Sequence, residues 1–208
     1  MAKFPEPPGR AQLLRIGPQL RVLPVGTELW RIYFLGGNHP VRWNGFRFYG
    51  PLPSARFDHH LSPAQPQQRG ILYAATSIVT CLAEVFQETH VVDISSRDPW
   101  LAGFALTAPV VLHDLTGSWP TVAGASMAVN SGPRGRARRW SQAIYDAYDQ
   151  VQGLWYCSSM HANQPAVAIY ERAEGALPAV PLFHRALADP VLLSPLRTAA
   201  QVLGYRLV

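Results

Sequence analysis

Residues 71–86 read ILYAATSIVTCLAEVF, and this stretch decides the fold class. The opening ILYAA is apolar and aromatic, which predicts a β-strand. Ser77 can cap a helix that follows directly, in which Ile78, Leu82 and Val85 recur at helical spacing. A strand that turns at once into a helix is typical of a domain that mixes both kinds of element.

Further strands and helices are predicted on both sides of this stretch. Apolar runs predict strands at residues 28–35, 90–95, 104–114 (broken at Pro109), 166–170, 181–187 and 204–208. Helical spacing predicts a long helix over 133–150 and a second one capped by Ser194 and stopped by Gly204. Residues 36–70 lack periodicity, which indicates a functional loop or hidden short strands. We therefore predict one α+β domain over 26–208, preceded by a loose N-terminal arm over 1–25 that packs on it.

Composition bounds the class of protein. At 208 residues, with 48% apolar and 15% charged residues, the chain is expected to fold around one substantial core. The net charge of +5 favours an anionic ligand or partner, but no aromatic-basic stacking motif predicts direct nucleic-acid binding. There is no secretory apolar region and no apolar stretch long enough for a membrane span, and Cys81 and Cys157 lack a C-x-x-C spacing. We expect a cytoplasmic protein that does not contact membranes.

Short segments around the predicted strands and helix carry polar residues suited to a doubly anionic ligand: Arg31 in LWRIY, Arg56 in SARFD, Tyr73 in LYA, Glu84 on the helix and Ser158 in GLWYCS. In this order, over residues 28–174, they resemble the RES domain, a bacterial toxin family named for its Arg, Glu and Ser. The sequence departs from the family pattern at Ala55, where glycine is usual, and at Cys157, where proline is common.

The resemblance implies an architecture like that of ADP-ribosyltransferases, in which two small, mostly antiparallel sheets flanked by helices form an NAD cleft. It implies that NAD is a substrate and not a cofactor, cleaved at the nicotinamide–ribose bond with inorganic phosphate or water as acceptor. It also implies a toxin neutralised by a cognate helix-turn-helix antitoxin. Two alternatives stay open: an enzyme that transfers ADP-ribose to a macromolecule, and a non-catalytic nucleotide-binding protein of the same fold.

The chemistry of this reaction assigns the predicted catalytic roles. Nicotinamide leaves as a neutral molecule, so the barrier lies in positive charge that grows on the ribose, and the Glu84 carboxylate would stabilise it. Arg31 interrupts an otherwise apolar strand, where a buried guanidinium requires an anionic partner such as a diphosphate. Tyr73 would stack on nicotinamide or on the ribose face.

Substrate-binding roles are predicted for five further residues. Arg56 and Arg47 compete for the diphosphate or an incoming phosphate. Ser158 would orient Glu84 or a ribose hydroxyl, Asn163 would support the same loop, and Tyr33 would line the cleft.

Plainer interpretations compete with these roles. By pattern alone, Glu84 could be a solvated helix residue and Arg31 could form an internal salt bridge to it. Tyr33 and Tyr73 could be core residues, and Asn163 an ordinary turn residue.

Two clusters of polar residues carry weaker signals. No metal site is predicted, because the pair His59-His60 has no further ligands at fitting spacing. The arginines at 134, 136, 138 and 139 lie near a predicted helix N-terminus, where a solvated basic face is the simplest interpretation and an anionic partner the alternative.

Overall fold

Strand β4 (Gln65–Ala75) lies within the main sheet and leads directly into helix α2 (Ile78–Val85), as the sequence predicts. The protein is seen here in a computed structural model that describes residues 4–37 and 40–208. The Ser77 hydroxyl accepts a hydrogen bond from the Thr80 amide at 3.2 Å and so caps α2. Cys81, Leu82 and Ala83 are buried on the inner side of this short helix.

The other elements are spread along the whole chain. The strands are β1 (Leu20–Leu23), β2 (Glu28–Phe34), β3 (Arg47–Gly50), β5 (Val91–Val92), β6 (Pro99–Ala105), β7 (Val110–Asp114), β8 (Gly153–Cys157), β9 (Pro165–Tyr170), β10 (Phe183–Ala186) and β11 (Arg206–Leu207). The helices are α1 (Arg10–Ile16), α3 (Trp119–Val122), α4 (Arg134–Ala147) and α5 (Leu193–Leu203), with 3-10 turns at Met127–Val129, Glu171–Ala176 and Pro190–Leu192.

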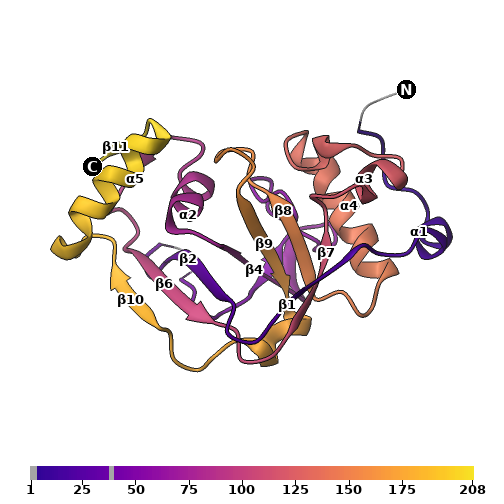
Figure 1. Cartoon of the computed structure of the whole chain (residues 1–208), viewed down its shortest axis with the longest axis horizontal. Coiled ribbons are helices and arrows are strands. Elements are labelled where there is room, and N and C mark those ends of the chain that lie inside the picture. Colours follow the sequence, from indigo (N-terminus) through magenta and orange to yellow (C-terminus); the bar gives the residue numbers. More distant parts are fainter. Residues whose placement is uncertain (1–3, 38–39) are drawn as a thin grey trace.

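The expected α+β class and single domain are confirmed. The resemblance implies two small sheets, whereas the described part of the chain has one large sheet and one two-stranded pair. Within the described residues, nine strands form one sheet: eight follow the hydrogen-bonded path β1-β7-β8-β9-β4-β2-β6-β10, and β3 pairs with β4 off this path. Pairing is antiparallel except between β7 and β8. Strands β5 and β11 form a separate parallel pair. In Figure 1, α1, α3 and α4 gather at one end of the molecule, and α2 and α5 lie at the other.

The main sheet is nearly divided at its middle. The register between β2 and β4 contains one residue pair in the described structure, Trp30 opposite Ala75. Beyond that pair, the residues of β2 after Trp30 and those of β4 before Ala75 separate and do not continue the ladder. The two halves of the sheet therefore diverge from this point, which brings the architecture close to the expected two-sheet cleft.

Buried side chains cover both faces of the sheet. Along β9, Ala166, Ala168 and Tyr170 belong to one apolar cluster, whereas Val167 and Ile169 belong to another. This alternation follows from the two-residue period of a strand. Both faces are thus packed, and the sheet provides a rigid frame.

Several predicted boundaries shift. The stretch 36–70 contains β3 and the start of β4, and the strand expected at 90–95 shortens to β5 because Asp93 accepts hydrogen bonds from the Ser95 and Ser96 amides. Ser194 lies inside α5 and does not cap it, while Gly204 ends the helix with φ 69° as predicted.

The segment expected as an N-terminal arm contains α1 and β1, and β1 pairs with β7; residues 1–3 lie outside the described part. None of the helices in the described ranges combines the length and apolar character that crossing a bilayer requires.

Candidate functional site

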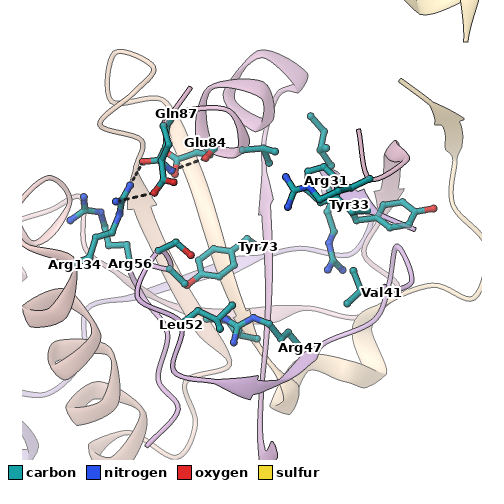
Figure 2. Close-up of a pocket in the computed structure, with 18 of the residues that line it drawn as sticks. Arg31, Tyr33, Val41, Arg47, Leu52, Arg56, Tyr73, Glu84, Gln87 and Arg134 are labelled. Carbon is teal, nitrogen blue, oxygen red and sulfur yellow. Dashed lines mark hydrogen bonds and ion pairs between the residues drawn. The ribbon is translucent and has the colours of Figure 1, made fainter. Parts of the chain in front are cut away.

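A cavity of about 510 Å³ opens where β2 and β4 stop pairing. Its walls come from β2, the loop after β3, strand β4, helix α2 and the start of α4. Figure 2 shows Arg56 and Arg134 on one side, Arg31 on the other, and Tyr73 between them. The described lining residues are Arg31, Ile32, Tyr33, Phe34, Val41, Arg47, Leu52, Ser54, Ala55, Arg56, Ile71, Tyr73, Glu84, Val85, Gln87, Glu88, Arg97, Arg134 and Tyr156.

Glu84 lies in the last turn of α2 and its side chain lines the cavity. Burial raises the pKa of its carboxyl group above the usual value, whereas a hydrogen bond with Ser158 and the positive charges of Arg56 and Arg134 lower it. Of the predicted apolar stripe of α2, Leu82 is buried in the core, whereas Val85 is exposed and lines the cavity together with Glu84. Glu84 is therefore a partly desolvated carboxylate with cations nearby.

Ser158 forms a side-chain hydrogen bond with the Glu84 carboxylate. It follows β8, is fully buried, and its hydroxyl oxygen accepts hydrogen bonds from the amides of Met160 (3.3 Å) and His161 (3.2 Å). In both contacts the Ser158 oxygen is the acceptor. The one proton of the hydroxyl is therefore free to be donated to Glu84. Asn163 lies in the turn after Ser158 with φ 60°, donates its amide to the Ser158 carbonyl at 3.0 Å and is absent from the described lining.

Arg31 is a buried cation without an anionic partner among the described residues. Its side chain on β2 is only 7% exposed, and its Nη1 donates to the carbonyls of Trp43 (2.8 Å) and Gly45 (2.9 Å). Burial lowers the pKa of the guanidinium to about 10, which leaves it charged at neutral pH. No carboxylate in the described ranges forms an ion pair with Arg31, so the internal salt bridge to Glu84 is not formed.

Arg56 and Arg47 both line the cavity, but their charges are used differently. The Arg47 guanidinium donates to Asp58 at 2.9 Å, an ion pair with a fully buried carboxylate. Arg56 donates to the Gly132 carbonyl at 2.5 Å and forms no ion pair within the described residues. Burial and the charge of Arg134 lower the pKa of Arg56. Arg56 therefore keeps the freer charge of the two.

Tyr73 and Tyr33 point in different directions. Tyr73 lines the cavity from β4, and its hydroxyl accepts a hydrogen bond from the Phe57 amide at 3.2 Å. Tyr33 lines the cavity as well, but its ring points away from the centre and its hydroxyl contacts His184 on β10 (Figure 2). Tyr33 is 3% exposed, which agrees with the alternative that it packs in the core.

Sequence reasoning missed several polar residues of the lining, among them Gln87, Glu88 and Arg134. Arg134 donates to the Gln87 side chain at 2.7 Å and lies 3.4 Å from a Glu88 carboxylate oxygen. Gln87 in turn donates to the Glu84 carbonyl at 2.6 Å, as Figure 2 shows. The signal was present in the arginine cluster at 134–139, which we interpreted as a solvated face. Only the folded structure distinguishes Arg134 from the other arginines of this cluster, because Arg134 alone among them belongs to the described lining.

The lining is rich in cations. Its described residues include five arginines and two carboxylates: Arg31, Arg47, Arg56, Arg97 and Arg134, and Glu84 and Glu88. Arg97 is exposed at the rim and stacks over the Phe34 ring at 4.1 Å. In the described parts of the chain, no group of three or more His, Cys, Asp and Glu side chains could hold a metal ion. The arrangement is suited to an anionic ligand placed beside one reactive carboxylate.

Comparisons with known proteins agree with this architecture. A chain in the crystal structure of the M. tuberculosis MbcT–MbcA toxin–antitoxin complex is similar, with a TM-score of 0.57 and 16% identity over 91% of this chain and 96% of that chain. At this identity the likeness concerns the fold alone. No curated protein sequence matches. The RES domain model matches residues 28–189, well over half of the 208 residues, and the chain therefore belongs to the RES domain family.

Proposed function

We propose that this protein cleaves the nicotinamide–ribose bond of NAD in the cavity between β2 and β4, with phosphate or water as acceptor. One observation carries the proposal: the Glu84 carboxylate and the Arg31 guanidinium, which has no ion pair in the described structure, line the same cavity, with Arg56 and Tyr73 beside them. A volume of about 510 Å³ lies within the range of pockets that enclose ligands of this size. Membership of the RES family supports NAD as the substrate.

The proposed reaction needs electrostatic stabilisation more than acid catalysis. As the bond breaks, its electron pair stays with the nicotinamide nitrogen, which becomes neutral, and positive charge appears on the ribose ring. Glu84 would face that charge, and partial exclusion of water strengthens their attraction. An oxygen of phosphate or water then forms the new bond to the ribose carbon and releases its proton to solvent.

The remaining residues would hold the dinucleotide. Arg31 and Arg56 have guanidinium groups without carboxylate partners in the described structure, so both can neutralise a diphosphate. Tyr73 offers an aromatic ring between them, and Ser158 would orient the Glu84 carboxylate through a hydrogen bond that favours its ionised form. Asn163 would act only through the turn that contains Ser158.

Product analysis tests the proposal. Purified protein is incubated with NAD, with and without inorganic phosphate, and the products are identified by mass. We expect free nicotinamide together with ADP-ribose or its phosphorylated form, and the effect of phosphate identifies the acceptor. Labelled ADP-ribose on a protein or nucleic acid would instead indicate a macromolecular acceptor. No nicotinamide under any condition, or tight binding without turnover, would contradict the proposal.

We also propose that the protein acts in the cytoplasm as a toxin with an antitoxin partner of the helix-turn-helix type. The support is the family and the fold shared with a chain of a toxin–antitoxin complex. Expression of the wild-type chain in a bacterial host is expected to deplete cellular NAD and stop growth, and Glu84→Gln is not. Co-expression of a helix-turn-helix protein from a neighbouring gene should restore growth and co-purify with the chain. Unaffected growth at full expression would contradict the toxin proposal.

A further inference from the structure

Asp58 is a buried carboxylate just behind the wall of the cavity. It is 0% exposed and is not among the described lining residues. Moving a carboxylate out of water is costly unless hydrogen bonds and opposite charges offset the loss of hydration. Packing alone therefore does not explain why a carboxylate occupies this position.

The contacts of Asp58 join two segments that both line the cavity. One Asp58 oxygen accepts hydrogen bonds from Arg47 Nη2 on β3 (2.9 Å) and from the Leu52 amide in the following loop (2.7 Å). The other oxygen contacts the His60 ring and accepts the His60 amide at 3.3 Å. Arg47 and Leu52 are both lining residues, so a single carboxylate fixes the spacing between them.

The loop fixed in this way carries Arg56. Of this loop, Leu52, Ser54, Ala55 and Arg56 line the cavity. Asp58 holds the start of this loop, and the Tyr73 hydroxyl holds its end through the Phe57 amide at 3.2 Å. Burial by itself raises the pKa of Asp58, but His60, Arg47 and the Leu52 amide outweigh it and hold that pKa at about 2. The Asp58 carboxylate is thus ionised throughout the physiological pH range.

We infer that Asp58 is a positioning residue for dinucleotide binding: it sets the place of Arg56 and Arg47 in the cavity wall without touching the substrate. The inference rests on the proposed function, because it concerns affinity for the ligand of that site. Glu84 lies on a different element, α2, and forms no hydrogen bond with Asp58 in the described structure. Loss of the Asp58 charge should therefore weaken binding much more than it slows the chemical step.

The test compares Asp58→Asn with wild type by calorimetry with ADP-ribose and by steady-state kinetics with NAD. The neutral amide of this variant cannot supply the negative charge that holds Arg47 and the Leu52 amide together. We expect Kd and KM to rise about tenfold while kcat changes less than about threefold. An unchanged or lower Kd, or an equal loss in kcat, would overturn the inference. If wild type binds neither nucleotide, the proposed function itself fails and the inference falls with it.

A matched control separates positioning from general stability. Asp114 on β7 is also a buried carboxylate (4% exposed) paired with an arginine, Arg21, at 2.9 Å, and it lies outside the described lining. Asp114→Asn is expected to lower the Tm while leaving the Kd for ADP-ribose within about twofold. A rise in Kd as large as that of Asp58→Asn would show that the effect is not specific to the contacts of Asp58.

A second variant decides the case if Asp58→Asn does not fold. Arg47→Lys keeps the charge of a partly exposed side chain, but an ammonium group cannot span Asp58 and the Tyr49 carbonyl as the guanidinium does. We expect a Kd for ADP-ribose at least about threefold higher than wild type. Wild-type affinity in Arg47→Lys would overturn the inference. When both variants fold, the double variant should lose no more affinity than Asp58→Asn alone, since the two residues act as one unit.

Discussion

Arg31 and Arg56 in the cavity and Arg136 and Arg139 on α4 are the same residue type in two different settings. Arg139 donates to both oxygens of Glu6, at 2.5 and 2.6 Å, and Arg136 lies 3.2 Å from the same carboxylate. The side chain of Arg139 is 50% exposed and that of Arg136 is 33% exposed. Arg31 and Arg56 donate only to backbone carbonyls in the described structure. The net charge of the chain therefore does not tell which cations are available to a ligand, whereas their partners do.

Removal of the carboxylate that lines the cavity beside Arg31 and Arg56 is expected to have the largest effect. Glu84→Gln keeps the shape of the side chain and removes the charge that stabilises the ribose cation. We expect kcat for nicotinamide release to fall at least about 100-fold, as for other groups aimed at transition-state charge. Quenched-flow assays with NAD measure the step directly. A kcat within about threefold of wild type would show that Glu84 is not the stabilising group.

The pH dependence follows from the same carboxylate. Because burial raises the pKa of Glu84 above 4.5, the ionised form is lost as pH falls through that higher value. Below it, kcat should drop about tenfold per pH unit, provided that the fold persists. A raised pKa also means that the folded chain holds this proton more tightly than the unfolded chain does. Glu84→Gln should therefore raise the Tm near pH 7, and this gain should vanish below pH 4.5.

Among the arginines, substitution of Arg31 is expected to lower activity most. Arg31→Gln leaves a polar side chain that can still donate to the Trp43 or Gly45 carbonyl but carries no charge. We expect kcat/KM for NAD to fall about 30-fold to 100-fold, since a buried charge that meets a diphosphate acts at low dielectric. Retention of the fold is checked by circular dichroism. An unchanged kcat/KM would show that the charge is structural.

Arg56 is expected to have a smaller effect because its side chain is only partly buried, whereas that of Arg31 is buried. Arg56→Gln should lower kcat/KM about tenfold, mainly through KM. Its hydrogen bond to the Gly132 carbonyl can be kept by glutamine. A purely structural Arg56 would change the Tm and leave KM where it is.

The paired surface arginines should matter least. Arg139→Gln breaks contacts with the exposed Glu6, and solvent-exposed ion pairs contribute at most about 1 kcal/mol to stability. We expect kcat/KM within about twofold of wild type and a small fall in Tm. A loss of activity comparable to that of Arg56→Gln would remove the distinction between the two groups of arginines.

Local signals predicted the strand-to-helix unit that places Tyr73 and Glu84. The apolar run of β4 and the Ser77 cap are short-range features, and both are present as expected. Hidden short strands were one alternative for the stretch 36–70, but the place of β3 could not be predicted because this strand exists only through pairing with β4. Strand β1 was not predicted, because it likewise depends on pairing with β7. Ion pairs between distant residues were also beyond reach: Arg47 and Asp58 both lie in the aperiodic stretch 36–70, but only the fold shows that one neutralises the other.

The position of Arg134 illustrates the same limit at the site. Its neighbours Arg136 and Arg139 share its sequence context, but the helix turns them towards Glu6 while Arg134 reaches Gln87. Arg136 and Arg139 are three residues apart and share one face of the helix, whereas Arg134, two residues before Arg136, points in another direction. Which partner each face meets depends on segments far along the chain. Sequence could place a basic cluster there but could not assign one member of it to the cavity.

A crystal structure of Glu84→Gln with bound NAD tests the central claim most directly, because the inactive variant would keep the dinucleotide intact. We predict that the ribose carbon bonded to nicotinamide faces position 84 and that the diphosphate lies against the guanidinium groups of Arg31 and Arg56. NAD bound elsewhere, for example along the Arg136 and Arg139 surface, or a diphosphate remote from both cavity arginines, would contradict the account.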